Sequence, residues 1–193
     1  MSTAGSHGVG AGGGRRPGWR AAYLLAAAAL YVADQASKAW AVKRLSGGEV
    51  VRVFDNLLHF GYAENPGIAF GRLQGGGEFG RWMLAALAAL AAVGLLAYFL
   101  RTKRTEDRLL GALALLLAGV AGNLTDRVRL GHVVDFIEVF IGSYQWPTFN
   151  VADAAICTGA ALLALDLILE GRREGREARA RAEGGAEATA GGR

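Results

Sequence analysis

Long apolar runs alternate along this chain with short charged segments. The apolar runs cover residues 21–42, 82–100, 109–127 and 151–169. A bilayer core about 30 Å thick is crossed by roughly 20 helical residues. Each run therefore predicts a transmembrane helix, and together they predict an integral membrane protein of mostly α class.

The first run is the least uniform of the four. It is interrupted by Asp34, Gln35 and Lys38, after which apolar residues resume. Its basic front and Ala-rich centre are also typical of a cleaved signal peptide. We favour a retained span, because the apolar pattern continues beyond the polar residues.

Between the first two runs, residues 49–70 have the pattern of short strands. β-branched and aromatic residues are interrupted by turn signals at Asp55-Asn56 and at Asn65-Pro66-Gly67. We expect a small β-element here on the outer membrane face. Residues 132–141 are similarly apolar and β-branched.

The remaining segments lie at the ends of the chain. Residues 1–18 are rich in Gly, Ser and Arg and predict a disordered tail, and residues 171–193 predict a charged, flexible tail. A single four-helix membrane domain over residues 19–170 is left between them.

Composition agrees with a membrane protein. Apolar residues make up 52% of the 193 residues and charged residues 20%, with a mean hydropathy of +0.26. The net charge of +4 raises the question of nucleic-acid binding. The basic residues lie mostly beside the apolar runs, however, which favours membrane topology and no nucleic-acid partner. Cys157 is the single cysteine, which excludes a disulfide framework, and we expect it to pack inside the fourth helix.

Lys and Arg also predict the orientation. They are concentrated in the loop 101–108 and beside both ends of the helical domain, and four spans put these three regions on one side. Because cytoplasmic loops carry the excess of Lys and Arg, that side is predicted to be cytoplasmic. Polar residues of the spans then gather at the outer face: Asp34, Lys38, Asn123, Asp126, Arg127 and Asp153.

Several of these residues also have a simple structural explanation. Asp34 and Lys38, four residues apart, could be a neutralised pair at the interface. Asp153, in the first turn of its helix, could be a cap. Asn65 and Gly67 could form only a turn. A shared site is favoured by their convergence, and by Gly119 and Gly122, which allow close helix packing.

Asp135 and Asp153 are the two outer carboxylates with apolar neighbours and without an obvious local basic partner. Two close carboxylates do not ionise together easily, so one keeps a proton. The ionised carboxylate can activate water while the protonated one polarises a carbonyl. This is aspartic-type peptide hydrolysis. The histidines lack metal-ligand spacing, and the glycines form no phosphate loop, so we predict neither metal nor cofactor.

Five motifs in this order resemble the lipoprotein signal peptidases of bacteria, also called type II signal peptidases. The motifs are residues 34–38 (DQASK), 65–70 (NPGIAF), 119–127 (GVAGNLTDR), 131–136 (GHVVDF) and 149–153 (FNVAD). The resemblance covers about residues 20–170. It implies an aspartic endopeptidase of the bacterial cytoplasmic (inner) membrane, with both termini cytoplasmic and the active site near the outer face.

The resemblance also implies the substrate and the site. Substrates would be prolipoproteins carrying a diacylglyceryl group on a Cys, cut just before that Cys by a monomer in contact with membrane lipids. Asp135 and Asp153 match the catalytic pair. The family's other polar positions around the pair are matched by Asp34, Lys38, Asn65, Asn123, Arg127 and Asn150. We also expect Gly67 and Asp126 to support the site.

Two other classes remain open from the residues alone. A proton-coupled transporter could use Asp34, Asp126 and Asp153 as relay groups, although no internal repeat supports one. A membrane scaffold could bind partners through the outer β-element.

Overall fold

The computed structural model describes residues 18–67, 77–103 and 105–190. The predicted N-terminal tail, apart from Gly18, lies outside the described residues, as do Ile68, Ala69 and Phe70. Each of the four apolar runs is a helix, as predicted. The helices are α1 (Trp19–Leu45), α2 (Gly77–Arg101), α3 (Asp107–Arg129) and α4 (Val151–Ala190).

Three of these helices are long and apolar enough to cross a membrane, not all four. They are Glu78–Arg101, Asp107–Arg129 and Val151–Glu177, with mean hydropathies of 2.4, 1.6 and 1.9. α1 is long enough at 27 residues. Its apolar content is diluted by the polar run from Asp34 to Lys38, whose two end residues are buried in the protein.

α4 is longer than predicted. We expected a flexible tail from residue 171, but the helix continues to Ala190. Ala, Arg and Glu dominate this stretch and are strong helix formers. Arg173 also donates to Glu177 one turn later, at 3.1 Å between Nε and Oε1. These local preferences outweigh the cost of the four glycines in this stretch, Gly171, Gly175, Gly184 and Gly185.

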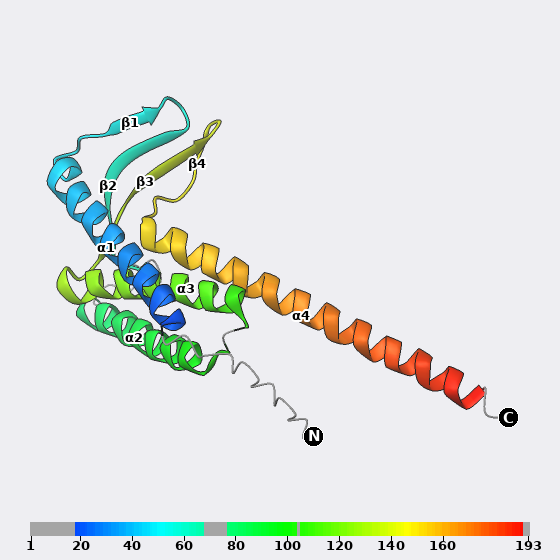
Figure 1. Ribbon diagram of the computed structural model, residues 1–193. Helices are drawn as coiled ribbons and strands as arrows, with labels where there is room; N and C mark the ends of the chain where they lie inside the picture. Colours follow the sequence, from blue (N-terminus) through cyan, green and yellow to red (C-terminus); the bar gives the residue numbers. More distant parts are fainter. Residues whose placement is uncertain (1–17, 68–76, 104, 191–193) are drawn as a thin grey trace, which may run out of the picture.

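α3 is the central helix, with α1, α2 and α4 packed around it (Figure 1). Its contact with α4 depends on glycine. A Cβ atom at Gly119 would meet the Ala152 carbonyl oxygen and the Ile156 side chain, and one at Gly159 would meet Leu116 of α3. The predicted close helix approach at Gly119 is therefore present.

The other helices expose apolar side chains on their outer surfaces. α2 exposes Leu90 and Val93, and α4 exposes Leu167 and Ile168. Cys157 is also exposed, on the predicted span α4. A helix that contacts the bundle along one face turns its remaining apolar residues outward, as expected for helices surrounded by lipid.

A four-stranded antiparallel sheet lies at one end of the helices (Figure 1). Its order is β1 (Val51–Phe54), β2 (Leu58–Asn65), β3 (Val133–Ile141) and β4 (Tyr144–Gln145). The predicted turn between β1 and β2 is present, and Asn56 adopts a φ of 58° there. β4, only two residues long, was not predicted.

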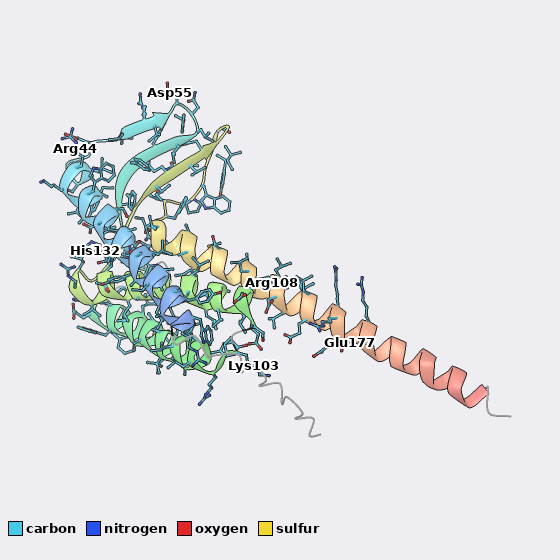
Figure 2. All side chains as sticks on the ribbon, in the orientation of Figure 1. Arg44, Asp55, Lys103, Arg108, His132 and Glu177 are labelled. Carbon is cyan, nitrogen blue, oxygen red and sulfur yellow. The ribbon has the colours of Figure 1, made fainter. Side chains whose placement is uncertain are left out.

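The sheet is attached to the end of α1. Ala41 and Leu45 of α1 are fully buried against Val134 and Phe136 of β3. Figure 2 shows Arg44 and Asp55 at this sheet end of the molecule, and Lys103 and Arg108 at the opposite end. The packing makes α1 an integral part of the core and fixes β3 beside the ends of α1 and α3.

Candidate active site

The predicted polar residues meet where the sheet joins the helices. They come from the second half of α1, the end of α3, strands β2 and β3 and the start of α4. Most are almost completely buried: Asp34, Lys38, Asn123, Asp126, Asp135 and Asn150 have exposed fractions of 7% or less. Buried polar groups are costly unless they are hydrogen-bonded, so the partners of each side chain matter.

Lys38 is at the centre of the buried charges. Its Nζ lies 3.0 Å from Asp34 Oδ2, 2.9 Å from Asp126 Oδ2 and 3.0 Å from Asn123 Oδ1. Three acceptors match the three donors of an ammonium group. The predicted Asp34–Lys38 pair exists, but it is part of a larger network linking α1 to α3.

Both aspartates that bind Lys38 also hold backbone of other elements. Asp34 Oδ1 accepts the Ala152 N–H at 2.8 Å, which is in the first turn of α4. Asp126 Oδ2 accepts the Val134 N–H of β3 at 3.2 Å. Gln35 Nε2 donates to both carboxylates, at 3.2 and 3.1 Å. The charges of α1 and α3 thus fix where α4 and β3 begin.

The start of α4 is closed by a reciprocal cap. Asn150 Oδ1 accepts the Asp153 N–H at 2.9 Å, and Asp153 Oδ2 accepts the Asn150 N–H at 3.2 Å. This is the capping-box pattern with Asp at the third position of the helix. Asn123 Nδ2 also donates to Asp153 Oδ1 at 2.7 Å. The structural explanation of Asp153 as a cap is therefore correct, and the cap fixes the orientation of its carboxylate.

Asp135 is held by two amide side chains. Asn65 Nδ2 donates to Oδ2 at 3.0 Å, and Asn150 Nδ2 donates to Oδ1 at 2.7 Å. Burial raises the pKa of Asp135 from 3.8 to about 6, and the negative charge of Asp153 acts in the same direction. The hydrogen bonds from Asn65 and Asn150 and the charge of Lys38 oppose this rise.

Asn150 connects the two carboxylates. Its side-chain amide binds Asp135, while its backbone N–H and its side-chain carbonyl bind Asp153. Figure 1 shows the start of α4 next to the sheet that carries Asp135. One fully buried residue thus determines how both acidic side chains lie.

Asn65 and Gly67 form the predicted turn at the end of β2. Asn65 Oδ1 accepts the Gly67 N–H at 3.0 Å, which leaves its amide nitrogen free to reach Asp135. Gly67 has a φ of 91° and lies against Leu84 of α2, so a side chain here would be both strained and crowded.

Arg127 lies on the last turns of α3, beside the carboxylates. Its Nη1 donates to its own helix at the Asn123 carbonyl, 3.3 Å away. The turn that carries it is held by Arg81 of α2, which donates to the Arg127 and Val128 carbonyls at 2.8 and 2.7 Å. Sequence analysis did not identify Arg81. The available signal was an Arg at the front of an otherwise apolar run.

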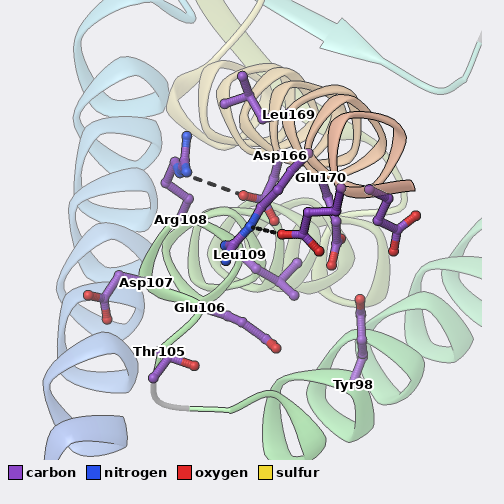
Figure 3. A pocket seen from close by; sticks show the side chains of 12 residues that line it. Tyr98, Thr105, Glu106, Asp107, Arg108, Leu109, Asp166, Leu169 and Glu170 are labelled. Atoms are coloured by element: carbon purple, nitrogen blue, oxygen red, sulfur yellow. Dashed lines mark hydrogen bonds and ion pairs between the residues drawn. The ribbon is translucent and has the colours of Figure 1, made fainter. Parts of the chain in front are cut away.

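A cavity of about 450 Å³ lies at the opposite end of the helices, between α2, α3 and α4 (Figure 3). None of the predicted site residues lines it. Arg108 and Asp166 face each other there, with 3.6 Å between Nε and Oδ1, and Arg108 is 60% exposed. Exposed charges of this kind interact weakly, and the predicted polar cluster lies at the other end of the helices.

Comparisons with known proteins give the class of protein. A family model described as signal peptidase (SPase) II matches residues 26–169. A lipoprotein signal peptidase of Syntrophus aciditrophicus is 39% identical over 76% of this chain and 91% of its own length. One of Geobacter sulfurreducens is 43% identical over 74% of this chain and 89% of its own length.

A solved structure agrees with this. A bacterial membrane enzyme determined at 1.9 Å resolution shares 28% identity with this chain and has a TM-score of 0.69. The match covers 76% of this chain and 92% of that one. The chain therefore belongs to the signal peptidase II family. It is a membrane peptidase of the kind that removes signal peptides from prolipoproteins.

Proposed function

We propose that the chain is an aspartic endopeptidase that cuts diacylglyceryl-modified prolipoproteins just before the lipidated Cys, with Asp135 and Asp153 as the catalytic pair. The observation that carries this proposal is the position of Asn150. Its side-chain Nδ2 donates a hydrogen bond to Asp135 Oδ1 at 2.7 Å, and its backbone N–H donates one to Asp153 Oδ2 at 3.2 Å. Two carboxylates bound to the same residue support a shared role at one peptide bond.

The two carboxylates have different surroundings, which suits different roles. Asp135 is 2% exposed and burial raises its pKa to about 6, so it takes up a proton more readily than a solvent-exposed carboxyl and suits the role of proton donor. Asp153 is only partly buried and receives hydrogen bonds from Asn123 and from the Asn150 N–H. It is the carboxylate that takes a proton from water.

The reaction then proceeds in two balanced steps. Asp153 accepts a proton from water while the water oxygen attacks the carbon of the scissile carbonyl. At the same time Asp135 donates its proton to the carbonyl oxygen. In the second step Asp153 passes its proton to the leaving amine, and the hydroxyl formed on the carbonyl carbon returns a proton to Asp135. The C–N bond breaks with no covalent intermediate. The positive charge of Arg127 lies beside the carboxylates and offsets their charge.

The lipid group of the substrate explains why such a site would lie at the end of the helices. A diacylglyceryl chain holds the Cys at the membrane interface, so the scissile bond reaches the site without leaving the membrane. In this arrangement α1 also crosses the membrane, in addition to α2, α3 and α4. The end that carries the sheet faces outward, and both ends of the 19–170 domain face the cytoplasm. The protein acts as a monomer in the inner membrane. The basic loop 101–108 supports this orientation.

The orientation can be measured directly. A topology reporter fused after Gly142 should register outside, and one fused after Arg104 inside. The reverse result would contradict this placement of the site.

Asp135→Asn and Asp153→Asn test the catalytic pair on a synthetic peptide with a diacylglyceryl-modified Cys. Each change should lower the cleavage rate by at least about a thousandfold and leave membrane insertion intact. Asp166→Asn is the matched control, because Asp166 is on α4 like Asp153 but pairs with Arg108 at the other end. It should cleave at the unmodified rate.

Undiminished cleavage by either dyad variant would refute the assignment. The same peptide without lipid should be a poor substrate. Equal cleavage of both peptides would contradict the substrate class while leaving the catalytic pair in place.

A further inference from the structure

A second cavity opens behind the buried charges, between the last turns of α1 and α3 and the start of β3. Its volume is about 270 Å³. Its walls are mainly apolar, formed by Ala39, Val42, Leu130 and Val134. Lys38 and Asp126 lie on its buried side, where they bind each other at 2.9 Å. We call it the rear cavity.

Two exposed cations, Lys43 and Arg129, line the rear cavity. Each belongs to the last turn of its helix, Lys43 in α1 and Arg129 in α3. Among the described residues, neither takes part in an ion pair. Arg44, by contrast, lies 3.8 Å from Glu49.

The helix dipoles favour cations at these positions but leave most of their charge uncompensated. A helix C-terminus carries about half a negative charge. The nearby carboxylate of Asp126 already binds Lys38, Gln35 and the Val134 N–H. The rear cavity therefore combines two unpaired positive charges with an apolar interior.

We propose that the rear cavity binds an anionic phospholipid of the bilayer, with its phosphate between Lys43 and Arg129. This inference rests on the proposed placement of α1 in the membrane. Small-molecule sites in proteins usually measure about 300–1,000 Å³, so 270 Å³ is too small for a whole lipid. It accommodates the glycerol backbone and the first carbons of one acyl chain, while the rest of the lipid stays in the bilayer.

A lipid in this position has a consequence for the active site. It closes the rear cavity over the buried Lys38–Asp126 pair and holds together α1 and α3, the two helices that carry the buried network beside Asp135 and Asp153.

Retention of lipid by the full-length protein tests the proposal. The protein is stripped in detergent, titrated with phosphatidylglycerol or phosphatidylcholine, and analysed by native mass spectrometry. We expect one phosphatidylglycerol to bind more tightly than phosphatidylcholine. A cation near an anionic lipid contributes about a factor of five in affinity. Lys43→Ala and Arg129→Ala should each weaken binding about fivefold, and the double variant roughly 25-fold.

Arg44→Ala is the matched control, because Arg44 is the next residue along α1 and does not line the rear cavity. It should retain phosphatidylglycerol like the unmodified protein. Ala39→Phe fills the apolar wall while keeping both cations, and it should also expel the lipid. Unchanged melting of each variant in lipid-free detergent would show that folding is intact.

Three results would overturn the proposal. The first is equal binding of phosphatidylglycerol and phosphatidylcholine. The second is an equal effect of Arg44→Ala and Lys43→Ala. The third is full competition by glycerol phosphate at the same concentration as the lipid, which would indicate a free phosphate site. The readout is binding, so it does not depend on peptidase activity and can fail or succeed separately from the proposed function.

Discussion

The two ends of the helix bundle both carry many charges but differ in how those charges are arranged. At the sheet end, Lys38, Asp34 and Asp126 are at most 3% exposed, and each binds at least two partners. At the other end, Arg108 is 60% exposed and pairs with Asp166 alone at 3.6 Å. The two ends therefore differ in burial and in saturated hydrogen bonding rather than in the number of charges.

Removing the central cation at each end is the strongest test of this difference. Lys38→Ala leaves the carboxylates of Asp34 and Asp126 buried without their cation. Breaking a buried ion pair costs about 3–5 kcal/mol, so we expect a loss of this size in the free energy of unfolding in detergent. Arg108→Ala removes an exposed pair and should cost at most about 1 kcal/mol.

A second change shows whether the loss comes from the uncompensated charge. Asp126→Asn combined with Lys38→Ala should cost clearly less than the sum of the two single changes, because the double variant buries one charge fewer. Similar losses for Lys38→Ala and Arg108→Ala would mean that the buried network adds nothing to stability.

The pH dependence of Asp135 gives the next largest effect. Its pKa in the fold is about 6, against 3.8 for the free group. A carboxyl with a raised pKa contributes fully below pH 4, and its contribution is lost as pH rises from about 4 to about 6. A rise of about two units in the pKa of Asp135 corresponds to roughly 3 kcal/mol in the free energy of unfolding.

Asp135→Asn cannot ionise and lacks this loss. As pH rises from 4 to 7, the unmodified protein should lose up to about 3 kcal/mol in its free energy of unfolding that the variant does not lose. This difference is expected whatever the stability of the variant at pH 4. Unfolding measured across this range checks the prediction. Parallel pH curves for the two proteins would show that Asp135 has an ordinary pKa.

Replacing two glycines of α3, one near each end, by Ala compares how tightly the two ends are packed. A Cβ at Gly122 would lie 2.5 Å from Asp34 Oδ2 and 3.2 Å from the Ala152 Cβ, whereas one at Gly111 meets nothing within 4 Å. Gly122→Ala should destabilise by about 1–3 kcal/mol and lower cleavage, because Asp34 is displaced. Gly111→Ala should stabilise by about 0.5–1 kcal/mol through helix propensity.

Thermal unfolding and cleavage of the lipidated peptide measure both effects of the glycine changes. Unchanged stability and cleavage for Gly122→Ala would indicate that Asp34 can move at little cost, which its contacts argue against.

The helices and the membership of the polar cluster were predictable from the sequence. A charged residue inside an apolar run is costly, so Asp34, Lys38 and Asp126 were visible against their neighbours. The two explanations offered for Asp153 were not exclusive, because its capping contacts with Asn150 and its place in the cluster exist together. Sequence reasoning weighed them as alternatives, since spacing alone does not show whether one contact serves two purposes.

Other features depend on tertiary contacts that no local pattern carries. Gln35 binds two carboxylates only because α1 and α3 meet at its position. β4 is two residues long and is defined by its pairing with β3. The polar run of α1 makes the helix less apolar as a span, although its charged residues Asp34 and Lys38 are buried against α3. Side-chain partners far apart in the chain decide each of these features.

The last comparison is between two similar arginines, one at each end of the bundle. Arg81 stacks on Trp82 and holds the end of α3, whereas Arg20 stacks on Trp19 and donates to the Thr102 carbonyl after α2. Replacement by Ala removes one hydrogen bond to the backbone at Arg20 and two at Arg81, and each change should cost about 1 kcal/mol in the free energy of unfolding. The two variants should differ in activity, because only Arg81 holds the turn that carries Arg127.

A displacement of about 1 Å at a catalytic group can cost roughly a hundredfold in rate. We therefore expect Arg81→Ala to lower kcat about ten- to a hundredfold, with Arg20→Ala near the unmodified rate. Arg81→Lys should restore only part of the loss, since an ammonium group lacks the planar fork that reaches both carbonyls. Equal cleavage by the two Ala variants would mean that the position of Arg127 does not depend on α2, and that α2 serves the site only by packing against α3.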